Sequence, residues 1–193
     1  MGSRSATVSA RLAEPTAAGL GPAASDIILL RQAVDLLENV GDALYTGTPS
    51  ICPGGSVGKH LRHCLDFYAC FLDGLPAGEI DYARRSRDRG VETRRERAIA
   101  RLHETIRGLS RLSARDVRRP LRIHGEEAGH DEDVCARSHS TVGRELQFLM
   151  SHSIHHYALI AIILRALGFD PDTTFGVAPS TLRHWRKVGA CVR

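Results

Sequence analysis

Residues 146–167 read LQFLMSHSIHHYALIAIILRAL, and this stretch decides the fold class. Apolar side chains fall on nearly every side of the helix that it would form. Ser140 or Thr141 can cap the beginning of this helix, and Gly168 marks its end. A helix that is apolar all round needs protein on all sides. We therefore expect a long central helix packed among other helices.

Two pairs of histidines share a helical spacing. His152 and His156 lie four residues apart in this stretch, so both imidazoles lie on one helix face, where core leucines would otherwise be. His60 and His63 lie three residues apart in an earlier amphipathic segment and also share a face. If the two helices face each other, they offer three or four nitrogen ligands to one metal ion.

These histidines also have a simpler interpretation. Imidazoles at the rim of a bundle can bond to water or to the backbone and have no further role. A buried imidazole without a hydrogen-bond partner costs about 1 to 3 kcal/mol, however, and coordination satisfies its nitrogen. A second pair on a separate segment therefore favours a metal site.

Three more long segments carry apolar residues at helical spacing, and a short one follows the central helix. Ser25 or Asp26 is expected to cap the first of them and Ser56 the second. We expect these helices at about 26–46, 57–74, 93–113 and 179–186.

The remaining segments are expected to be irregular. Residues 1–24 are rich in Ala, Gly, Ser and Pro, which predicts a disordered leader. Residues 120–140 contain short β-type runs broken by glycines, which indicates a hairpin or irregular loop before the last long helix. The fold class predicted is all-α, an antiparallel four-helix bundle forming one domain over residues 25–190.

Composition limits the partners and the compartment. The net charge is +4, but the arginines between Arg84 and Arg101 alternate with acidic residues, which favours a solvated segment over a nucleic-acid site. Five cysteines form no CxxC pair, as expected of reduced thiols in the cytoplasm. No apolar stretch reaches the roughly 20 residues that span a bilayer, so no membrane partner is expected.

Other polar residues near the histidines are weaker candidates. Asp66 and Glu145 could orient a ligand or act as a base, although solvated or capping roles are more typical of such carboxylates. Cys64 points about 100° away from its histidine neighbour and is interpreted as a core residue. Ser153 stands where an HExxH peptidase has its glutamate, so peptidase activity is disfavoured, and a mid-helix serine is usually structural.

The sequence resembles the DinB-like family over most of the chain after Asp26. Ser56-Val57-Gly58, followed by His63, is similar to the family's entry into the second helix. The pair His152 and His156 resembles the pair on its last long helix. Asp81-Tyr82 with the arginines after it, and FGVAPSTL at 175–182, resemble one branch of the family.

The resemblance implies a divalent metal, zinc or nickel, held by His63, His152 and His156 with positions open for water or substrate. His60 and His155 are additional histidines, so a shifted ligand set stays open. In such a site the metal could bring the pKa of a bound water or thiol toward neutrality. The family includes thiol-dependent S-transferases and isomerases.

Two functions follow from these expectations. The first is a metal-dependent transferase or hydrolase that acts on a small molecule, with a low-molecular-weight thiol as a candidate partner. The second is a non-catalytic bundle that binds a partner, with a structural metal or none. The sequence indicates no catalytic residue beyond the metal ligands. It also shows no dimer seam, although bundles often form homodimers through an exposed helix face.

Overall fold

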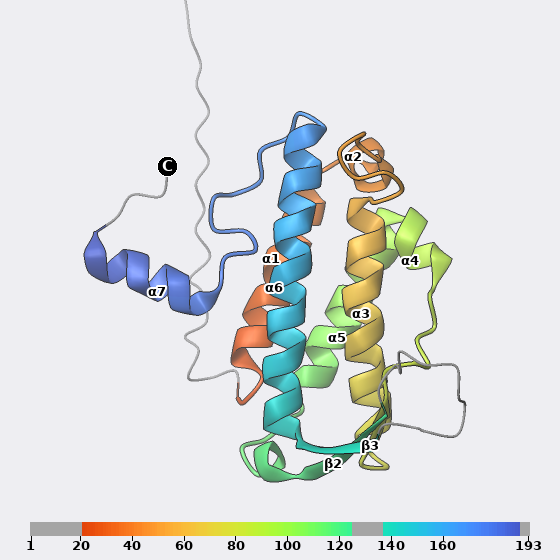
Figure 1. The fold of residues 1–193 in the computed structure, drawn as a ribbon, viewed down its shortest axis with the longest axis vertical. Helices are drawn as coiled ribbons and strands as arrows, with labels where there is room; N and C mark the ends of the chain where they lie inside the picture. The colour runs from red at the N-terminus through yellow and green to blue at the C-terminus, as the bar shows by residue number, and fades with distance from the viewer. Residues whose placement is uncertain (1–20, 125–136, 190–193) are drawn as a thin grey trace, which may run out of the picture.

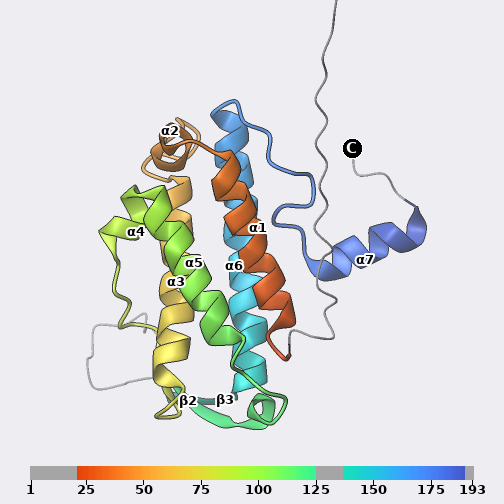
Figure 2. The same cartoon turned by 180° about the vertical axis from the view of Figure 1, so that it is seen from behind.

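A computed structural model describes residues 21–124 and 137–189. Its body is a bundle of four long helices, α1 (Ala24–Asn39), α3 (Val57–Gly74), α5 (Arg95–Leu109) and α6 (Val142–Ala166). Helices α1 and α6 run in one direction and α3 and α5 in the other (Figures 1 and 2). The expected all-α, antiparallel four-helix bundle is confirmed.

A crossover joins α3 to α5. Residues 75–94 lead from the lower end of α3 back to the upper end of the bundle, and α4 (Arg89–Thr93) lies at the end of this path (Figure 1). Because of this return, α5 begins at the same end of the bundle as α3. The crossover passes beside α3, the helix that carries His60 and His63.

A small sheet closes the lower end of the bundle. Its strands β1 (Glu79–Asp81), β2 (Pro120–His124) and β3 (Arg137–Thr141) lie in the order β1-β2-β3. Strands β2 and β3 are antiparallel, so of the two alternatives for residues 120–140, a hairpin or an irregular loop, the structure has the hairpin pairing, although the segment between the strands lies outside the described residues. Strand β1 pairs parallel to β2 and was not predicted.

One predicted helix is interrupted, and another is shorter than expected. The first ends at Asn39 because Val40 adopts extended backbone angles, and the short helix α2 (Asp42–Thr46) follows. The third, expected at about 93–113, is α5, which begins at Arg95 after the extended Arg94 and stops at Leu109, and the short helix α4 before it was not predicted. The apolar pattern continues through the break in the first helix, because Val40 and Tyr45 are buried in the same core as α1.

The predicted caps are right for two helices and wrong for one. Ser56 accepts a hydrogen bond of 3.1 Å from the backbone N–H of Lys59, and Thr141 accepts one of 3.3 Å from that of Arg144. The first helix begins at Ala24 without a side-chain cap. Asp26 is instead buried and accepts a hydrogen bond from Tyr68, so it is a core residue and not a cap.

Helix α6 packs against α1 and α3, but it is not covered all round. Ile162 is 48% exposed, so the expectation of a fully enclosed central helix is met only in part. By length and composition alone, α6 could also cross a membrane, which differs from our sequence expectation. Core helices of bundles pass the same test, so it is weak evidence for a membrane span.

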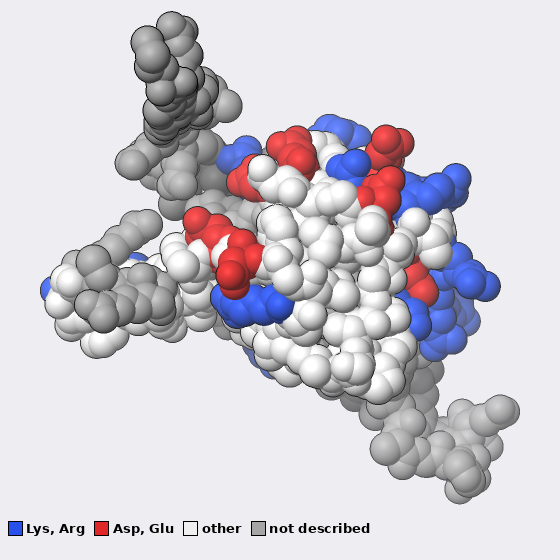
Figure 3. All heavy atoms as spheres, turned by 90° about the horizontal axis from the view of Figure 1, so that it is seen from above, with Lys and Arg blue, Asp and Glu red and all other residues white. Residues whose placement is uncertain are grey.

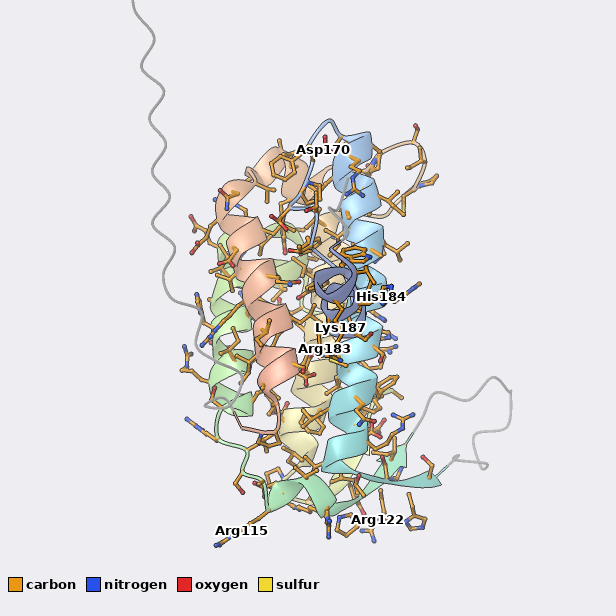
Figure 4. All side chains as sticks on the ribbon, turned by 90° about the vertical axis from the view of Figure 1, so that its left-hand side faces the viewer. Arg115, Arg122, Asp170, Arg183, His184 and Lys187 are labelled. Carbon is orange, nitrogen blue, oxygen red and sulfur yellow. The ribbon has the colours of Figure 1, made fainter. Side chains whose placement is uncertain are left out.

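The last helix, α7 (Pro179–Val188), projects away from the bundle (Figures 1 and 2). The segment before it is fastened to α6, since the ring of Phe175 stacks on that of Tyr157 with centroids 4.9 Å apart. In Figure 4, α7 is seen end-on with Arg183, His184 and Lys187 labelled, and these three residues are exposed. The predicted leader lies almost wholly outside the described residues, so the boundaries 1–24 and 25–190 stay predictions.

Candidate metal centre

Helices α3 and α6 are antiparallel neighbours, and they bring three histidines together. The ring centroid of His63 lies 4.9 Å from that of His152 and 4.6 Å from that of His156. One nitrogen of each ring lies within 4.8 Å of the corresponding atoms of the other two. We call this group the histidine triad. The three residues expected to bind metal are therefore the three that form one cluster.

One nitrogen of the triad is buried without a partner. Among the described residues, Nε2 of His152 has no hydrogen-bond partner, although it is shielded from solvent. Such an atom is costly unless something binds it. Three imidazole nitrogens that converge in this way are a donor set suited to zinc or nickel. The residues present thus fit a divalent metal.

The surroundings keep the triad uncharged. Burial, together with the neighbouring imidazoles, lowers the pKa of His63 to about 4 and that of His156 to about 3. Burial also lowers the pKa of His152. A metal ligand must have a free lone pair, and these rings have one at neutral pH.

The two additional histidines occupy different positions. His155 is exposed, and its ring meets the edge of the His156 ring with centroids 5.3 Å apart. His60 is partly buried, and its Nδ1 lies 2.9 Å from Nδ1 of His156. Neither belongs to the triad as the structure groups it.

An aromatic wall of Phe67, Tyr82 and Phe148 borders the triad. The Phe67 ring lies 4.5 Å from that of His152, and the Tyr82 ring packs within 5.5 Å of the other two members of the wall. Sequence reasoning did not assign these residues to the site. The spacing could have done so for Phe67 and Phe148, because each lies one helical turn from a triad histidine.

Close packing at the beginning of α3 explains why residue 58 is a glycine. A Cβ atom at this position would lie 2.0 Å from the backbone oxygen of Glu92 in α4. Glycine therefore allows the end of the crossover to pack directly against α3. The Ser56 cap and this contact fix the first turns of the helix, on which His60 and His63 lie.

Comparison with protein families identifies the fold. A family model described as the DinB superfamily matches residues 29–160, and this range includes the whole triad. The chain belongs to the DinB superfamily. Its members generally bind a metal, in agreement with the converging histidines.

One relative shares sequence similarity with most of this chain. FK506-binding protein 5 from Rhizopus delemar is 34% identical over 161 residues, which cover 82% of this chain and 37% of that protein. This DinB-superfamily chain thus spans little more than a third of the relative's length. No solved structure matches the chain.

The two carboxylates considered as bases are engaged elsewhere in this DinB-superfamily protein. Asp66 is buried, pairs with Arg62 at 2.7 Å and accepts a hydrogen bond from Ser86 of the crossover. Glu145 is also buried, where it accepts hydrogen bonds from Tyr82 and Ser140. Both side chains hold neighbouring segments in place, a role that the sequence did not reveal.

The sulfur and hydroxyl candidates lie in the core. Cys64 is 1% exposed and burial raises the pKa of its thiol to about 12, so it is a core residue as expected. Cys70 packs against the core, and burial raises the pKa of its thiol too. Ser153 is 1% exposed, as expected of a structural mid-helix serine.

Several arginines of α3 and α5 pair with acidic residues. Arg97 lies 2.9 Å from Asp88, Arg95 lies 2.8 Å from Asp42, and Arg62 bonds to both Asp66 and Glu92. Seen from above, basic and acidic side chains occur together around the margin of the molecule (Figure 3). This mixture agrees with the solvated segment expected from the sequence.

Proposed function

We propose that this chain binds one divalent metal ion, zinc or nickel, through His63, His152 and His156, and that it is a metal-dependent transferase or hydrolase acting on a small molecule. The observation that carries the proposal is the buried, unpartnered Nε2 of His152 within the triad. Membership of a family that generally binds metal supports it.

The number of ligands favours chemistry over a purely structural role. Structural zinc sites have four protein ligands, whereas catalytic sites have three and leave a position open. A divalent ion in such a site brings the pKa of a bound water or thiol toward neutrality. The triad would hold the ion, and the aromatic wall borders it on the side of Phe67 and His152.

Asp66 and Glu145 are not the proton acceptors in this scheme, because their partners already hold both carboxylates. The substrate or co-substrate then brings its own ionisable group to the ion. A low-molecular-weight thiol meets this need, and we propose it as the partner. The free thiols of Cys52, Cys64 and Cys70 agree with the reducing cytoplasm in which such thiols are abundant.

The name of the Rhizopus relative refers to FK506, but we do not propose that ligand for this chain. The match covers 37% of that protein, so the name describes a molecule most of which has no counterpart here.

The alternative is a non-catalytic bundle that binds a partner, with its metal fully coordinated by protein or with none. A fourth protein ligand would have to be another residue near the triad, and His60 is the nearest candidate through its contact with His156. This alternative predicts that no small molecule reaches the ion.

Cobalt substitution distinguishes the metal-dependent enzyme from the non-catalytic bundle. We would load the protein with Co²⁺ and record its visible and near-ultraviolet spectrum while adding 2-mercaptoethanol. An open position predicts a thiolate-to-cobalt charge-transfer band that saturates with thiol. The same titration on His184→Ala, an exposed residue of α7, should be unchanged. A cobalt spectrum that does not respond to any thiol would exclude the open site.

A further inference from the structure

His60 bonds to a member of the histidine triad without belonging to it. Its Nδ1 lies 2.9 Å from Nδ1 of His156, which is a hydrogen-bond distance, and the two rings are 5.2 Å apart between centroids. The triad itself is defined by nitrogens within 4.8 Å of one another, and His60 does not meet that condition. His60 therefore contacts the triad from outside it.

The hydrogen bond restricts the tautomers of both rings. A neutral imidazole carries one proton, so of the two facing Nδ1 atoms one must donate and the other accept. If His60 donated, His156 would carry its proton on Nε2 and would have no lone pair there. If His156 donates, its Nε2 lone pair is free, while Nε2 of His60 carries the other proton.

We propose that His60 is a positioning residue that accepts the Nδ1–H of His156 and so presents Nε2 of His156 to the metal. This inference rests on the proposed metal centre. Metal-binding histidines usually donate their second N–H to a carboxylate or carbonyl oxygen. Here, a second imidazole takes that place.

The position of His60 suits this role. It lies in the first turns of α3, where its backbone N–H bonds to the carbonyl of Ser56. The Ser56 cap and the close packing of Gly58 on α4 hold this part of the helix. Its side chain is partly buried, so the bond to His156 is shielded from competition with bulk water.

His155 provides a matched control. It also contacts the His156 ring, but it is exposed, and the structure gives no hydrogen bond between the two. Removing either neighbour deletes one imidazole next to His156. Only the loss of His60 removes the hydrogen bond that sets the tautomer.

The first test is zinc affinity, measured by competition with a chromophoric chelator in wild type, His60→Ala, His60→Asn and His155→Ala. Loss of a supporting hydrogen bond typically weakens metal binding about 10- to 100-fold. We expect that loss in His60→Ala, and a substantial recovery in His60→Asn, whose amide oxygen can accept the same hydrogen. His155→Ala should bind zinc within about threefold of wild type.

The second test reads the tautomers directly in the wild-type protein. In zinc-loaded protein labelled with ¹⁵N at histidine, two-bond proton–nitrogen spectra should show His156 protonated at Nδ1 and metal-bound at Nε2. His60 should be protonated at Nε2, with neither nitrogen on the metal. This readout does not depend on any variant folding correctly.

The outcomes separate this inference from the metal centre. If the wild-type protein binds no zinc, the proposed metal centre itself is wrong. A protein that binds zinc equally well in wild type and His60→Ala, or a His60 nitrogen with a metal-bound chemical shift, overturns the positioning role and leaves the centre intact.

Discussion

The hydroxyl of Tyr68 donates a hydrogen bond of 2.9 Å to the carboxylate of Asp26, and both side chains are almost completely buried. The bond joins the first turn of α1 to α3 inside the core. Burial raises the pKa of Asp26 from 3.8 to about 7, although the hydrogen bond from Tyr68 lowers it. The folded protein therefore keeps a proton on Asp26 over a range in which an unfolded chain releases it.

The pH dependence of stability follows from this difference. The raised pKa means that the contribution of Asp26 is fully present below pH 3.8 and is lost as the pH rises to about 7. The loss amounts to at most about 4 kcal/mol. We expect Asp26→Asn to be more stable than wild type at pH 8, with a smaller difference at pH 5, in urea unfolding. If Asp26→Asn differs from wild type in stability by the same amount at pH 5 and at pH 8, the prediction is contradicted.

In the metal-free protein, the triad histidines change stability with pH in the direction opposite to that of Asp26. Their pKa values are lowered from 6.5 to about 4 for His63 and about 3 for His156, so the unfolded chain takes up protons first as the pH falls. Stability should therefore decrease on acidification below about pH 6.5. Thermal unfolding in the Asp26→Asn background isolates this effect, and His63→Leu should weaken the decrease. If stability falls as steeply with decreasing pH in His63→Leu as in its parent, the histidines do not cause the decrease.

The bond from Tyr82 to Glu145 supports the aromatic wall. Tyr82→Phe removes one of the two hydrogen bonds to a buried carboxylate, which should destabilise the protein by about 1 to 3 kcal/mol. Glu145→Gln and the double variant complete a double-mutant cycle in chemical denaturation. We expect the two effects to be non-additive. Strict additivity would mean that the residues do not interact.

Gly58 should tolerate no side chain, because α4 approaches it so closely. In Gly58→Ala the new methyl group would overlap the backbone of Glu92, and we expect a loss of about 1 to 3 kcal/mol. Gly41→Ala is the control, since no atom lies within 4 Å of the corresponding position and its φ is −84°. It should cost about 1 kcal/mol or less. Equal losses in both variants would mean that the close contact has no special cost.

The apolar periodicity of the sequence was sufficient to predict the long helices and the helix faces on which the histidines lie. The apolar stretch of α6 and the capped start of α3 place His63, His152 and His156 on facing surfaces, and the structure brings them together. Local pattern could not reveal contacts between distant segments. The parallel pairing of β1 with β2 and the bond from Tyr82 to Glu145 depend on the path of the crossover.

Two residues show what local rules could not reveal. Asp26 has the composition and position of a helix cap, but the hydroxyl of Tyr68 and the surrounding core make burial possible. His60 shares a face with His63 and was therefore a candidate ligand. The pattern could not show that its Nδ1 faces Nδ1 of His156, a detail set by how α3 is rotated against α6.

The central claim is that one divalent metal ion binds at the histidine triad, and elemental analysis tests it most directly. The protein would be purified without chelators or an affinity tag beside His63→Ala, His156→Ala and the control His184→Ala. We predict close to one zinc or nickel ion per chain in wild type and in the control, and almost none in the two triad variants, with helix content retained by circular dichroism. Metal absent from wild type even after reconstitution, or retained in both triad variants, would contradict the claim.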